Sequence, residues 1–455
     1  MRNLDAGNRD LLFAASVLGS FSTASLRHLV PSASNTAIDW FISRHLVRST
    51  HDEWLPFALH DNVRDAVYGA TSVSGGAWSR NVWQETSQLA VTWLLQALPS
   101  EAKTSADRSK LSQAAILVAR LSAGEDLRPE FVQLIIILRE LGLWLTLDAV
   151  EALLEPNRGT DAVRDLCVCI ELIRSTHMTR REVAVTAKSI VVSSQDEHIR
   201  LLASQVGFAA AMVCGDMSAG RAFLLTRGES PAARLDLAWR ESDFRGMALI
   251  LRGDAPKGTI EQIRQTSKVG HLALAEGQFD DALRQFDEAR SLAEQVDSAL
   301  WIGRTSRHAA MAATFAGNAD SARRVTEAAQ HNLVLYDVIG HNQCLALTAL
   351  HRAADGKVRE AFEGFRSARN AMIAFEAWGD AGFVIMLEVL ADLRYDLHLP
   401  DESRVLLDDD RVWRVHAWRR EIIAAWMGHP SPAPSPQWSR EPLEVFSSWR
   451  EVIAR

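Results

Sequence analysis

The stretch GQFDDALRQFDEA, residues 277–289, occurs three times in related form and decides the fold. It returns as GNADSARRVTEAA at 317–329 and as GKVREAFEGFRSA at 356–368, so the leading glycines Gly277, Gly317 and Gly356 are almost evenly spaced. In each copy the glycine is followed, at fixed offsets, by an alanine, a bulkier residue and a second alanine. Self-similarity at a fixed period of this length indicates a stack of repeated structural units.

Each repeat is predicted to be a pair of helices. Proline is absent from 257 to 399, and residues that favour helices dominate this region. We expect the leading glycines to end or follow the first helix of each pair. Small residues stand where two antiparallel helices approach closely, and bulkier residues point into the next layer. The small residues are Gly270, Ala310 and Ala349 on the first helices and Ala282, Ala322 and Ala361 on the second; the bulkier ones are Phe286, Thr326 and Phe365.

This pattern resembles the tetratricopeptide repeat (TPR), a helix–turn–helix unit with small residues at these sites. The likeness is in register over about 263–370. An ordinary unit has about 34 residues, so each pair here needs an extra helical turn or a longer loop. Long repeats of this kind resemble the superhelical sensor region of large bacterial ATP-dependent regulators. The resemblance implies an all-α fold, with a TPR-like superhelix of about 40-residue repeats over 256–427.

Decayed copies of the unit flank the repeats, and we expect 71–255 to be a degenerate helical-repeat region. Residues 411–426, with three tryptophans, are expected to form one helix that caps the last layer. Residues 428–455 are expected to contain a proline-rich spacer and a helix near 441–454. Predicted helices in the degenerate region include 77–98, 108–122, 129–140, 160–175, 181–193 and 197–214.

Residues 1–70 have a different pattern. Three helices are predicted here. The first covers 8–18, the second begins after a cap at Ser22 or Thr23, and the third covers 35–45. Two short β-like runs then follow within 46–60, to which strand is expected to be almost entirely confined, and a fourth helix opens at Asp61. Three helices with a β-hairpin are the plan of a winged helix, so we expect a small winged-helix domain over 1–70.

A short motif follows the predicted hairpin: Leu59, His60 and Asp61, with Arg64 one helical turn later. It resembles the element that ends the wing in STAND regulators (signal-transducing ATPases with numerous domains, including the NB-ARC group), which also carry a repeat solenoid downstream. The resemblance implies that His60 would contact the phosphate side of a nucleotide when the ATPase core is present. The alternative is structural: Asp61 caps the helix and His60 is half-buried at the hairpin edge.

Signatures of catalysis are absent from the sequence. A phosphate-binding loop needs G-x-x-x-x-G-K-[S/T], and no such run exists. G-x-S-x-G and H-E-x-x-H are absent as well. We therefore expect a protein that is not an enzyme, has no cofactor or metal, and neither binds ATP tightly nor hydrolyses it on its own.

The composition of the chain limits the classes of partner and the cellular compartment that we expect. The net charge of −8, without a charged tail, does not favour nucleic acid or an anionic membrane as a partner. The four cysteines show no zinc spacing and suit a reducing cytosol. The apolar run at 11–19 is short for a signal peptide. Asp5 and Asp10 precede this run, where a signal peptide would carry positive charge. We expect a cytoplasmic protein without a membrane span.

Two functions of different classes remain open, with an unrecognised α-helical enzyme as a third. The first is a protein-interaction or ligand-sensing module, whose partner is a protein or peptide (for example a separate ATPase subunit) or a small-molecule effector. The second is a transcriptional regulator that binds DNA through the winged helix. DNA binding requires cationic side chains, but residues 1–70 carry six arginines against seven acidic residues. The third predicted helix carries Asp39, Trp40 and Phe41, which are better suited to packing against protein.

The ligand is expected on the concave side of the superhelix, which the first helices of a TPR array line. Arg304 and Arg307 share one helical face, and Arg264 lies one repeat earlier. Three guanidinium groups would form a clamp for a carboxylate or phosphate; alternatively, they pair with Glu or Asp on neighbouring helices. The predicted site comprises Arg264, Ser267, His271, Arg304, Arg307, Thr314 and Gln343.

Overall fold

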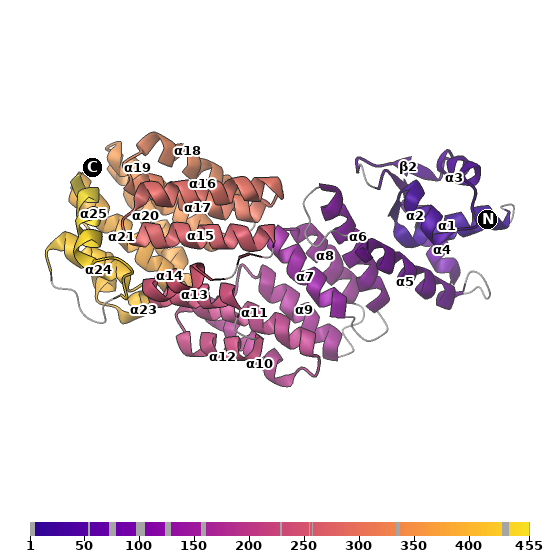
Figure 1. Cartoon of the computed structure of the whole chain (residues 1–455), viewed down its shortest axis with the longest axis horizontal. Helices are drawn as coiled ribbons and strands as arrows, with labels where there is room; N and C mark the ends of the chain where they lie inside the picture. The colour runs from indigo at the N-terminus through magenta and orange to yellow at the C-terminus, as the bar shows by residue number, and fades with distance from the viewer. Residues whose placement is uncertain are drawn as a thin grey trace. The chain divides into compact units, whose positions relative to one another are not determined.

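The computed structural model of the chain is an all-α solenoid that also contains one small sheet (Figure 1). By their internal contacts the residues divide into two compact units, the first of 1–139 with 143–170 and the second of 140–142 with 171–455. The structure describes residues 5–52, 55–71, 79–96, 105–122, 129–155, 161–227, 230–253, 255–256, 258–333, 337–429 and 436–454.

The first unit opens with three helices and a three-stranded antiparallel sheet. The helices are α1 (Ala6–Leu18), α2 (Thr23–Leu29) and α3 (Asn35–Ile42), and α4 (Asp61–Thr71) follows the sheet. The strands are β1 (Ser20–Phe21), β2 (Val47–Ser49) and β3 (Phe57–Leu59), in the order β1-β3-β2. Strand β1 lies outside the predicted 46–60. Two residues are too few to show the alternation of apolar and polar side chains that predicts a strand.

The described remainder of the first unit is mainly helical. Four amphipathic helices follow the sheet region, and their buried faces carry leucine, isoleucine, valine and phenylalanine. Their bounds agree with the predicted ranges to within three residues wherever a range was predicted. The helices are α5 (Arg80–Gln96), α6 (Ser105–Ser122), α7 (Pro129–Leu141) and α8 (Trp144–Leu154), and α9 (Asp161–Arg174) leads into the second unit.

Before the repeats the second unit contains five described helices, most of them shorter than those of the repeats. Helix α10 begins with a capping box, in which the Thr179 side chain accepts from the Glu182 N–H and Glu182 accepts from the Thr179 N–H. Helix α11 ends at Gly215 in the left-handed conformation. The helices are α10 (Arg180–Ser193), α11 (Glu197–Cys214), α12 (Met217–Arg227), α13 (Pro231–Glu241) and α14 (Phe244–Leu251).

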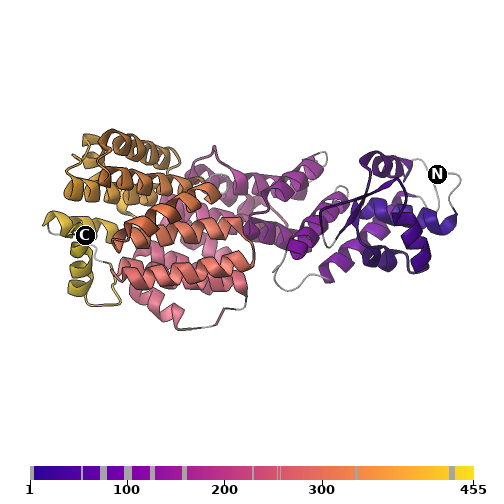
Figure 2. The same ribbon diagram turned by 90° about the horizontal axis from the view of Figure 1, so that it is seen from above.

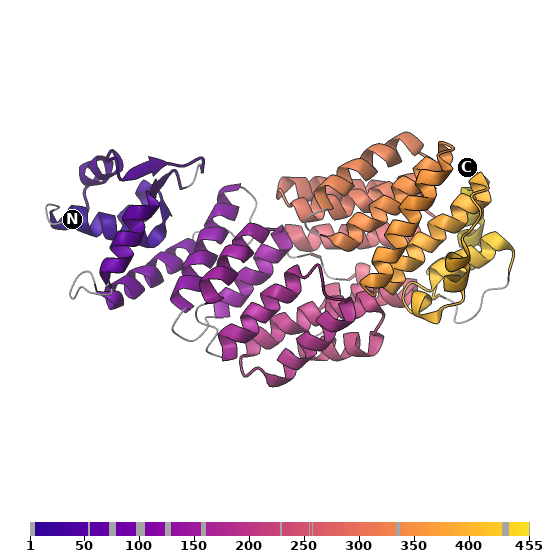
Figure 3. The ribbon, with the colours of Figure 1, turned by 180° about the vertical axis from the view of Figure 1, so that it is seen from behind.

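The three repeats form helix pairs that lie side by side, as Figures 2 and 3 show from above and from behind. Nearly all of these helices have 17 residues, and three-residue turns join them except between α18 and α19, where residues 334–336 lie outside the described part of the chain. The repeat exceeds the ordinary length because its helices are longer, not its loops. The pairs are α15 (Thr259–Ala275) with α16 (Phe279–Gln295), α17 (Ala299–Phe315) with α18 (Ala319–Leu333), and α19 (Val338–Ala354) with α20 (Val358–Ala374); α21 (Trp378–Tyr395) begins a fourth unit.

The turns between these helices share one backbone conformation. Gly277, Gly317 and Gly356 have φ of 74°, 82° and 72°, which confirms that the repeated glycines end the first helices. Asp297 and Glu376 take the same left-handed conformation at the equivalent point of two other turns, with φ of 48° and 52°. Aspartate and glutamate give no turn signal as strong as glycine, so the sequence shows only part of this regularity.

The small positions of the repeats allow close helix packing, as predicted. A Cβ added at Gly270 would lie 2.7 Å from the ring of Phe286, so the second helix could not approach so closely with any other residue. Ala282, Ala322 and Ala361 are fully buried. Phe286, Thr326 and Phe365 are also buried, so the three bulkier positions are part of the core.

Two glycine substitutions separate backbone strain from steric conflict. Gly356→Ala should lower the free energy of unfolding by about 1 kcal/mol, because alanine is strained at positive φ although nothing lies within 4 Å of the new methyl group. Gly277→Ala should cost more, because its Cβ would also lie 2.6 Å from Cβ of Ser448. Urea unfolding of both variants measures the difference. Equal costs would contradict the close packing of α25 (Pro442–Ala454) on this turn.

The C-terminal region differs from the prediction at one point. Residues 411–426 are not one helix: α23 (Asp410–Trp413) and α24 (Trp418–Met427) are separated by a turn. His416 in this turn has φ of 56°, and its N–H donates to the carbonyl oxygen of Arg240 at 2.8 Å. This tertiary hydrogen bond replaces a helical one. A short α22 (Asp401–Leu407) precedes, α25 follows close to its predicted range, and most of the proline-rich spacer lies outside the described residues.

Candidate ligand site on the first helices of the repeats

Buried and half-buried polar side chains from α13, α15, α17, α19, α21, the turn before α24 and the start of α24 lie close together in the second unit. These helices are brought together by the repeat packing and by the return of the chain after α21. We call this group the polar cluster. Its members are Arg240, His271, Arg307, His308, Gln343, Asp380, His416 and Arg419.

Aromatic rings hold the histidines of the polar cluster. The ring of Trp239 lies 4.8 Å from that of His271 and 4.9 Å from that of His416, measured between centroids. His271 in turn contacts His308 edge to face at 4.2 Å. The imidazoles of His271 and His416 thereby contact a single tryptophan, and that of His308 contacts His271.

Arg307 lies at the centre of α17 and is only 9% exposed. Its Nη2 is 2.6 Å from Nε2 of His308. A guanidinium group can only donate, so Nε2 of His308 accepts and the ring proton is on Nδ1. A Cβ at Gly340 would lie 2.7 Å from Nη1 of Arg307, so this glycine on α19 gives the guanidinium group its space.

Asp380 is the carboxylate of the polar cluster, and it is 5% exposed. Its Oδ1 accepts a hydrogen bond of 2.7 Å from Nε2 of Gln343, and its Oδ2 is 3.9 Å from Nη1 of Arg240. Arg419 donates to the carbonyl oxygen of Gly379 at 2.6 Å. Burial lowers the pKa of Arg419 to about 9, and the charges of Arg240 and Arg307 contribute although Asp380 opposes them.

A second carboxylate, Asp337, joins the polar cluster to the start of α19. Its Oδ1 accepts from the N–H of Gly340 at 2.9 Å, and its Oδ2 accepts from Nε of Arg304 at 3.0 Å. Burial raises the pKa of Asp337, but Arg304, Arg307 and the backbone hydrogen bond outweigh it and hold that pKa at about 2. Asp337 is therefore ionised and both caps the helix and orients Arg304.

The three arginines predicted as a clamp have different surroundings. Arg304 pairs with Asp337, and Arg264 pairs with Glu140, a residue of the second unit by its contacts. Both guanidinium groups also lie near the ring of Trp301, at 5.5 and 5.6 Å from its centroid. Among the described residues Arg307 has no carboxylate within ion-pair distance. A clamp made of all three side chains stays a prediction.

The remaining predicted site residues are buried. Ser267, His271, Thr314 and Gln343 are each less than 9% exposed. Thr314 donates to the carbonyl oxygen of Ala310 in its own helix at 2.8 Å, so this hydroxyl is used locally. The structure brings His271, Arg307 and Gln343 into one cluster.

Sequence reasoning missed five members of the polar cluster: Arg240, His308, Asp380, His416 and Arg419. His308 is the neighbour of Arg307 on α17, Arg240 precedes the recognisable repeats, and the other three follow them. No spacing in the sequence relates these last four residues to α15, α17 and α19. A fourth repeat extrapolated at the same period would have indicated the start of α21, and with it Asp380.

The motif at 59–64 is ordered at the junction of β3 and α4. Leu59 is buried, whereas His60 is exposed rather than half-buried. The carbonyl oxygen of His60 accepts from the N–H of Arg64 at 3.1 Å, and Asp61 lies 3.3 Å from Nη2 of Arg64. These contacts stabilise the first turn of α4. A role of His60 toward a nucleotide stays a prediction.

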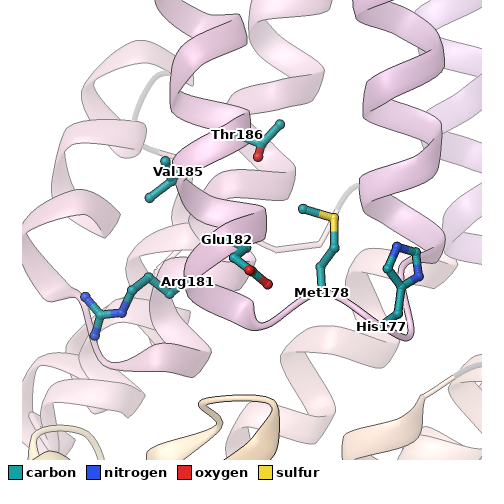
Figure 4. Close-up of a pocket in the computed structure, with 6 residues that line it drawn as sticks. All are labelled: His177, Met178, Arg181, Glu182, Val185 and Thr186. Carbon is teal, nitrogen blue, oxygen red and sulfur yellow. The ribbon is translucent and has the colours of Figure 1, made fainter.

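Two other features outside the polar cluster have the composition of a site. An open surface pocket of about 530 Å³ is lined by two residues of the turn before α10 and four residues of that helix (Figure 4). Its charged groups serve the fold, because Glu182 caps α10 and Arg181 pairs with Glu376 at 2.7 Å. Asp392, Asp396 and His398 have metal-like spacing on the surface. Exposed carboxylates of this kind are common without an ion, so neither feature carries a function here.

None of the described helices combines the length and apolarity needed to cross a membrane.

Acid should destabilise the second unit through the buried histidines. Burial lowers the pKa of His271 and of His416 well below 6.5, and the neighbouring cations Lys268, Arg240 and Arg419 lower both further. Below pH 6.5 the unfolded chain therefore binds more protons than the folded one. Each such histidine should remove about 1.4 kcal/mol of stability per pH unit between pH 6.5 and 5.

Urea unfolding at several pH values measures this slope. His271→Asn should reduce it, whereas His398→Asn, at an exposed histidine, should leave it unchanged. A stability that is flat from pH 7 to 5 would show that the buried histidines are not neutral in the folded state.

Comparison with known proteins gives a fold likeness at low identity. No protein-family model matches the chain, and no curated protein matches it. A signal transduction ATPase with numerous domains, with a tetratricopeptide repeat sensor, from Pyrococcus horikoshii is 12% identical with a TM-score of 0.42. That alignment covers 94% of this chain, which spans 61% of that protein.

A Rap protein in complex with competence and sporulation factor is 11% identical with a TM-score of 0.29, over 85% of this chain and 98% of that one. Both TM-scores are below 0.5, so the proposals below depend on the geometry of this chain.

Proposed function

We propose that this chain is a non-enzymatic interaction or ligand-sensing module, and that its ligand binds at the first helices of the repeats. The observation that carries the proposal is a set of buried polar atoms, from several different helices, that have no hydrogen-bond partner among the described residues. Nearly all buried polar groups in proteins are hydrogen-bonded, so a concentration of such atoms favours a site for a ligand or bound water. The atoms are Ser267 Oγ, His271 Nδ1, Arg307 Nε, His308 Nδ1, Gln343 Oε1, Asp380 Oδ2, His416 Nδ1 and Arg419 Nε.

The chemistry of the polar cluster favours binding over catalysis. Cys344 interacts with Arg307, and burial raises the pKa of this thiol to about 12, so it is not a thiolate nucleophile. The histidines contact arginine and aromatic rings rather than a hydroxyl nucleophile. All four cysteines are buried thiols rather than disulfides, which supports a reducing, cytoplasmic location. A protein or peptide partner, such as a separate ATPase subunit, and a small-molecule effector are the two ligand classes.

For residues 1–70 we propose a winged-helix domain related to that of STAND regulators. A degenerate repeat region would begin near residue 71. The TPR-like superhelix would then cover 256–427. Support comes from the element order helix, strand, helix, helix, strand, strand, followed directly by a helical solenoid.

The surface of α3 favours contact with protein over contact with DNA. Trp40 is 38% exposed, with the guanidinium group of Arg44 3.5 Å from its ring centroid, and the adjacent Asp39 is exposed. A gel shift on random duplex DNA at low salt tests the alternative of a DNA-binding regulator. Retardation at micromolar protein would favour that alternative.

A capture experiment with matched variants tests the ligand site. The full chain is immobilised and exposed to native lysate, in parallel with the variant Arg304→Ala/Arg307→Ala. The control is Arg359→Ala/Arg366→Ala on the second helix α20, where both arginines are exposed. We expect a partner to bind the wild type and the control at least tenfold better than the first-helix variant.

Circular dichroism and thermal unfolding establish that both variants are folded. A partner that binds the first-helix variant as well as the wild type would place the interaction elsewhere and contradict the proposal.

A further inference from the structure

This inference rests on the proposed function and specifies the ligand of the same site. We infer that the polar cluster binds an oxyanion, the carboxylate or phosphate group of a ligand, through Arg307 and Arg419 with Arg240 beside them. The three guanidinium groups belong to α17, α24 and α13, so an oxyanion there would join three separate elements of the second unit.

The charge balance of the cluster is the first argument. Two neighbouring cations are already paired: Lys268 with Asp236 at 2.6 Å and Arg304 with Asp337 at 3.0 Å. Asp337, which also attracts Arg307 through space, is already paired with Arg304, so Arg240, Arg307 and Arg419 share one further carboxylate, Asp380, and its Oδ1 is held by Gln343. Buried charges are stable when they are paired and hydrogen-bonded. The described part of the protein therefore supplies too few carboxylates for its buried cations at this place.

Unused donors are the second argument. Nε of Arg307, Nε of Arg419 and Nη1 of Arg240 are buried without a hydrogen-bond partner among the described residues. Arg307 and Arg419 are more than nine-tenths buried, so bulk water does not serve these groups freely. The planar guanidinium fork matches the oxygens of carboxylate and phosphate better than any other side chain does.

The histidines support the same ligand class. The tautomer of His308 set by Arg307 leaves an Nδ1–H donor that has no partner among the described residues. Burial and the surrounding cations hold the pKa of His271, His308 and His416 well below 6.5, so these rings are neutral. The excess positive charge is carried by the arginines alone; burial is the main cause of the lowered pKa of Arg419, and Arg240 and Arg307 lower it further.

Thermal unfolding of the full chain with simple anions tests the inference. The wild type is unfolded at pH 7.5 in sodium chloride, sodium phosphate and sodium acetate of equal ionic strength. We expect phosphate, acetate or both to raise the unfolding temperature in a saturable manner that chloride does not reproduce. Phosphate alone would indicate a phosphorylated ligand, and acetate a carboxylate ligand. No response to either anion would overturn the inference.

Two variants locate the site. Arg307→Met should unfold at the same or a higher temperature than the wild type without added anion, because it removes a buried charge that has no carboxylate partner. Its apparent affinity for the anion should fall at least tenfold, and Arg419→Met should behave in the same way. The control is Arg323→Met. Arg323 lies outside the polar cluster and pairs with Asp355, so this variant should keep the full anion response.

An Arg307→Met protein that is misfolded, or that keeps the wild-type anion response, would contradict an oxyanion site there. If neither anion stabilises the wild type, yet partner capture still depends on Arg304 and Arg307, the oxyanion inference fails and the proposed ligand site stands.

Discussion

Replacing Glu388 with glutamine should lower the free energy of unfolding of the second unit by about 3–5 kcal/mol, because it leaves a buried arginine without its counter-ion. Glu388 on α21 pairs with Arg369 on α20, and both are at most 3% exposed. Ser403 at the start of α22 completes the group: it accepts from Arg369 at 2.7 Å and donates to Glu388 at 2.5 Å. Burial raises the pKa of Glu388, and Arg369 and Ser403 lower it again in part.

Removing both charges together separates the effect of the pair from that of its surroundings. Arg369→Met/Glu388→Met should be much closer to the wild type in stability than Glu388→Gln is, since it removes both charges together. The exposed pair Arg359–Glu363 is the control, and its loss should cost less than about 1 kcal/mol. Urea unfolding measures all four proteins. A cost below about 1 kcal/mol for Glu388→Gln would mean that Arg369 finds another partner or reaches water.

Trp449→Ala should destabilise the second unit by a similar amount, about 3–5 kcal/mol, as large-to-small changes in cores do. Trp449 on α25 is completely buried, and its ring contacts those of Phe279, Phe315, Trp418 and Trp426. Its Nε1 donates to the carbonyl oxygen of Ala275 at 2.8 Å. The substitution therefore leaves a cavity and also removes the partner of a buried carbonyl group.

The control for this prediction is Leu443→Ala on the same helix, at a side chain that is 85% exposed. It should change the free energy of unfolding by less than about 0.5 kcal/mol. Thermal and urea unfolding distinguish the two variants. A Trp449→Ala protein as stable as the control would show that α25 does not dock on the first repeat in solution.

The docking of α25 also bears on the site. Ser439 and Arg440 donate their N–H groups to Oε1 of Glu276 in the turn after α15, and Gln437 exchanges backbone hydrogen bonds with Ser242 and Arg245. Residues 437–440 and α25 thereby contact the first repeat, α14 and α24 together. Arg240 and His416 of the polar cluster lie beside these contacts, so we expect loss of α25 to weaken ligand binding as well as stability.

The sequence by itself determined the repeat and its period, and with them the solenoid. A residue such as Gly270 or Ala282 carries this information because each copy repeats the same steric requirement: a small residue where two helices touch and a glycine where the chain turns. Helix bounds followed from the same local rules to within a few residues. The strand pair within 46–60 was predictable for a comparable reason, since a turn and flanking apolar runs are local features.

Only the tertiary structure decided what the repeated face contains. The break at His416 depends on a hydrogen bond to Arg240, which lies before the repeats and far away in the chain, and no local pattern encodes it. The separation of the three predicted arginines is of the same kind: Glu140 and Asp337 pair with two of them, whereas Arg307 lies among Arg240, Asp380 and Arg419. Helix periodicity states which side chains share a face. Which charges become neighbours, and which of them stay without a counter-ion, depends on how distant segments pack, because electrostatic pairing acts through space and not along the sequence.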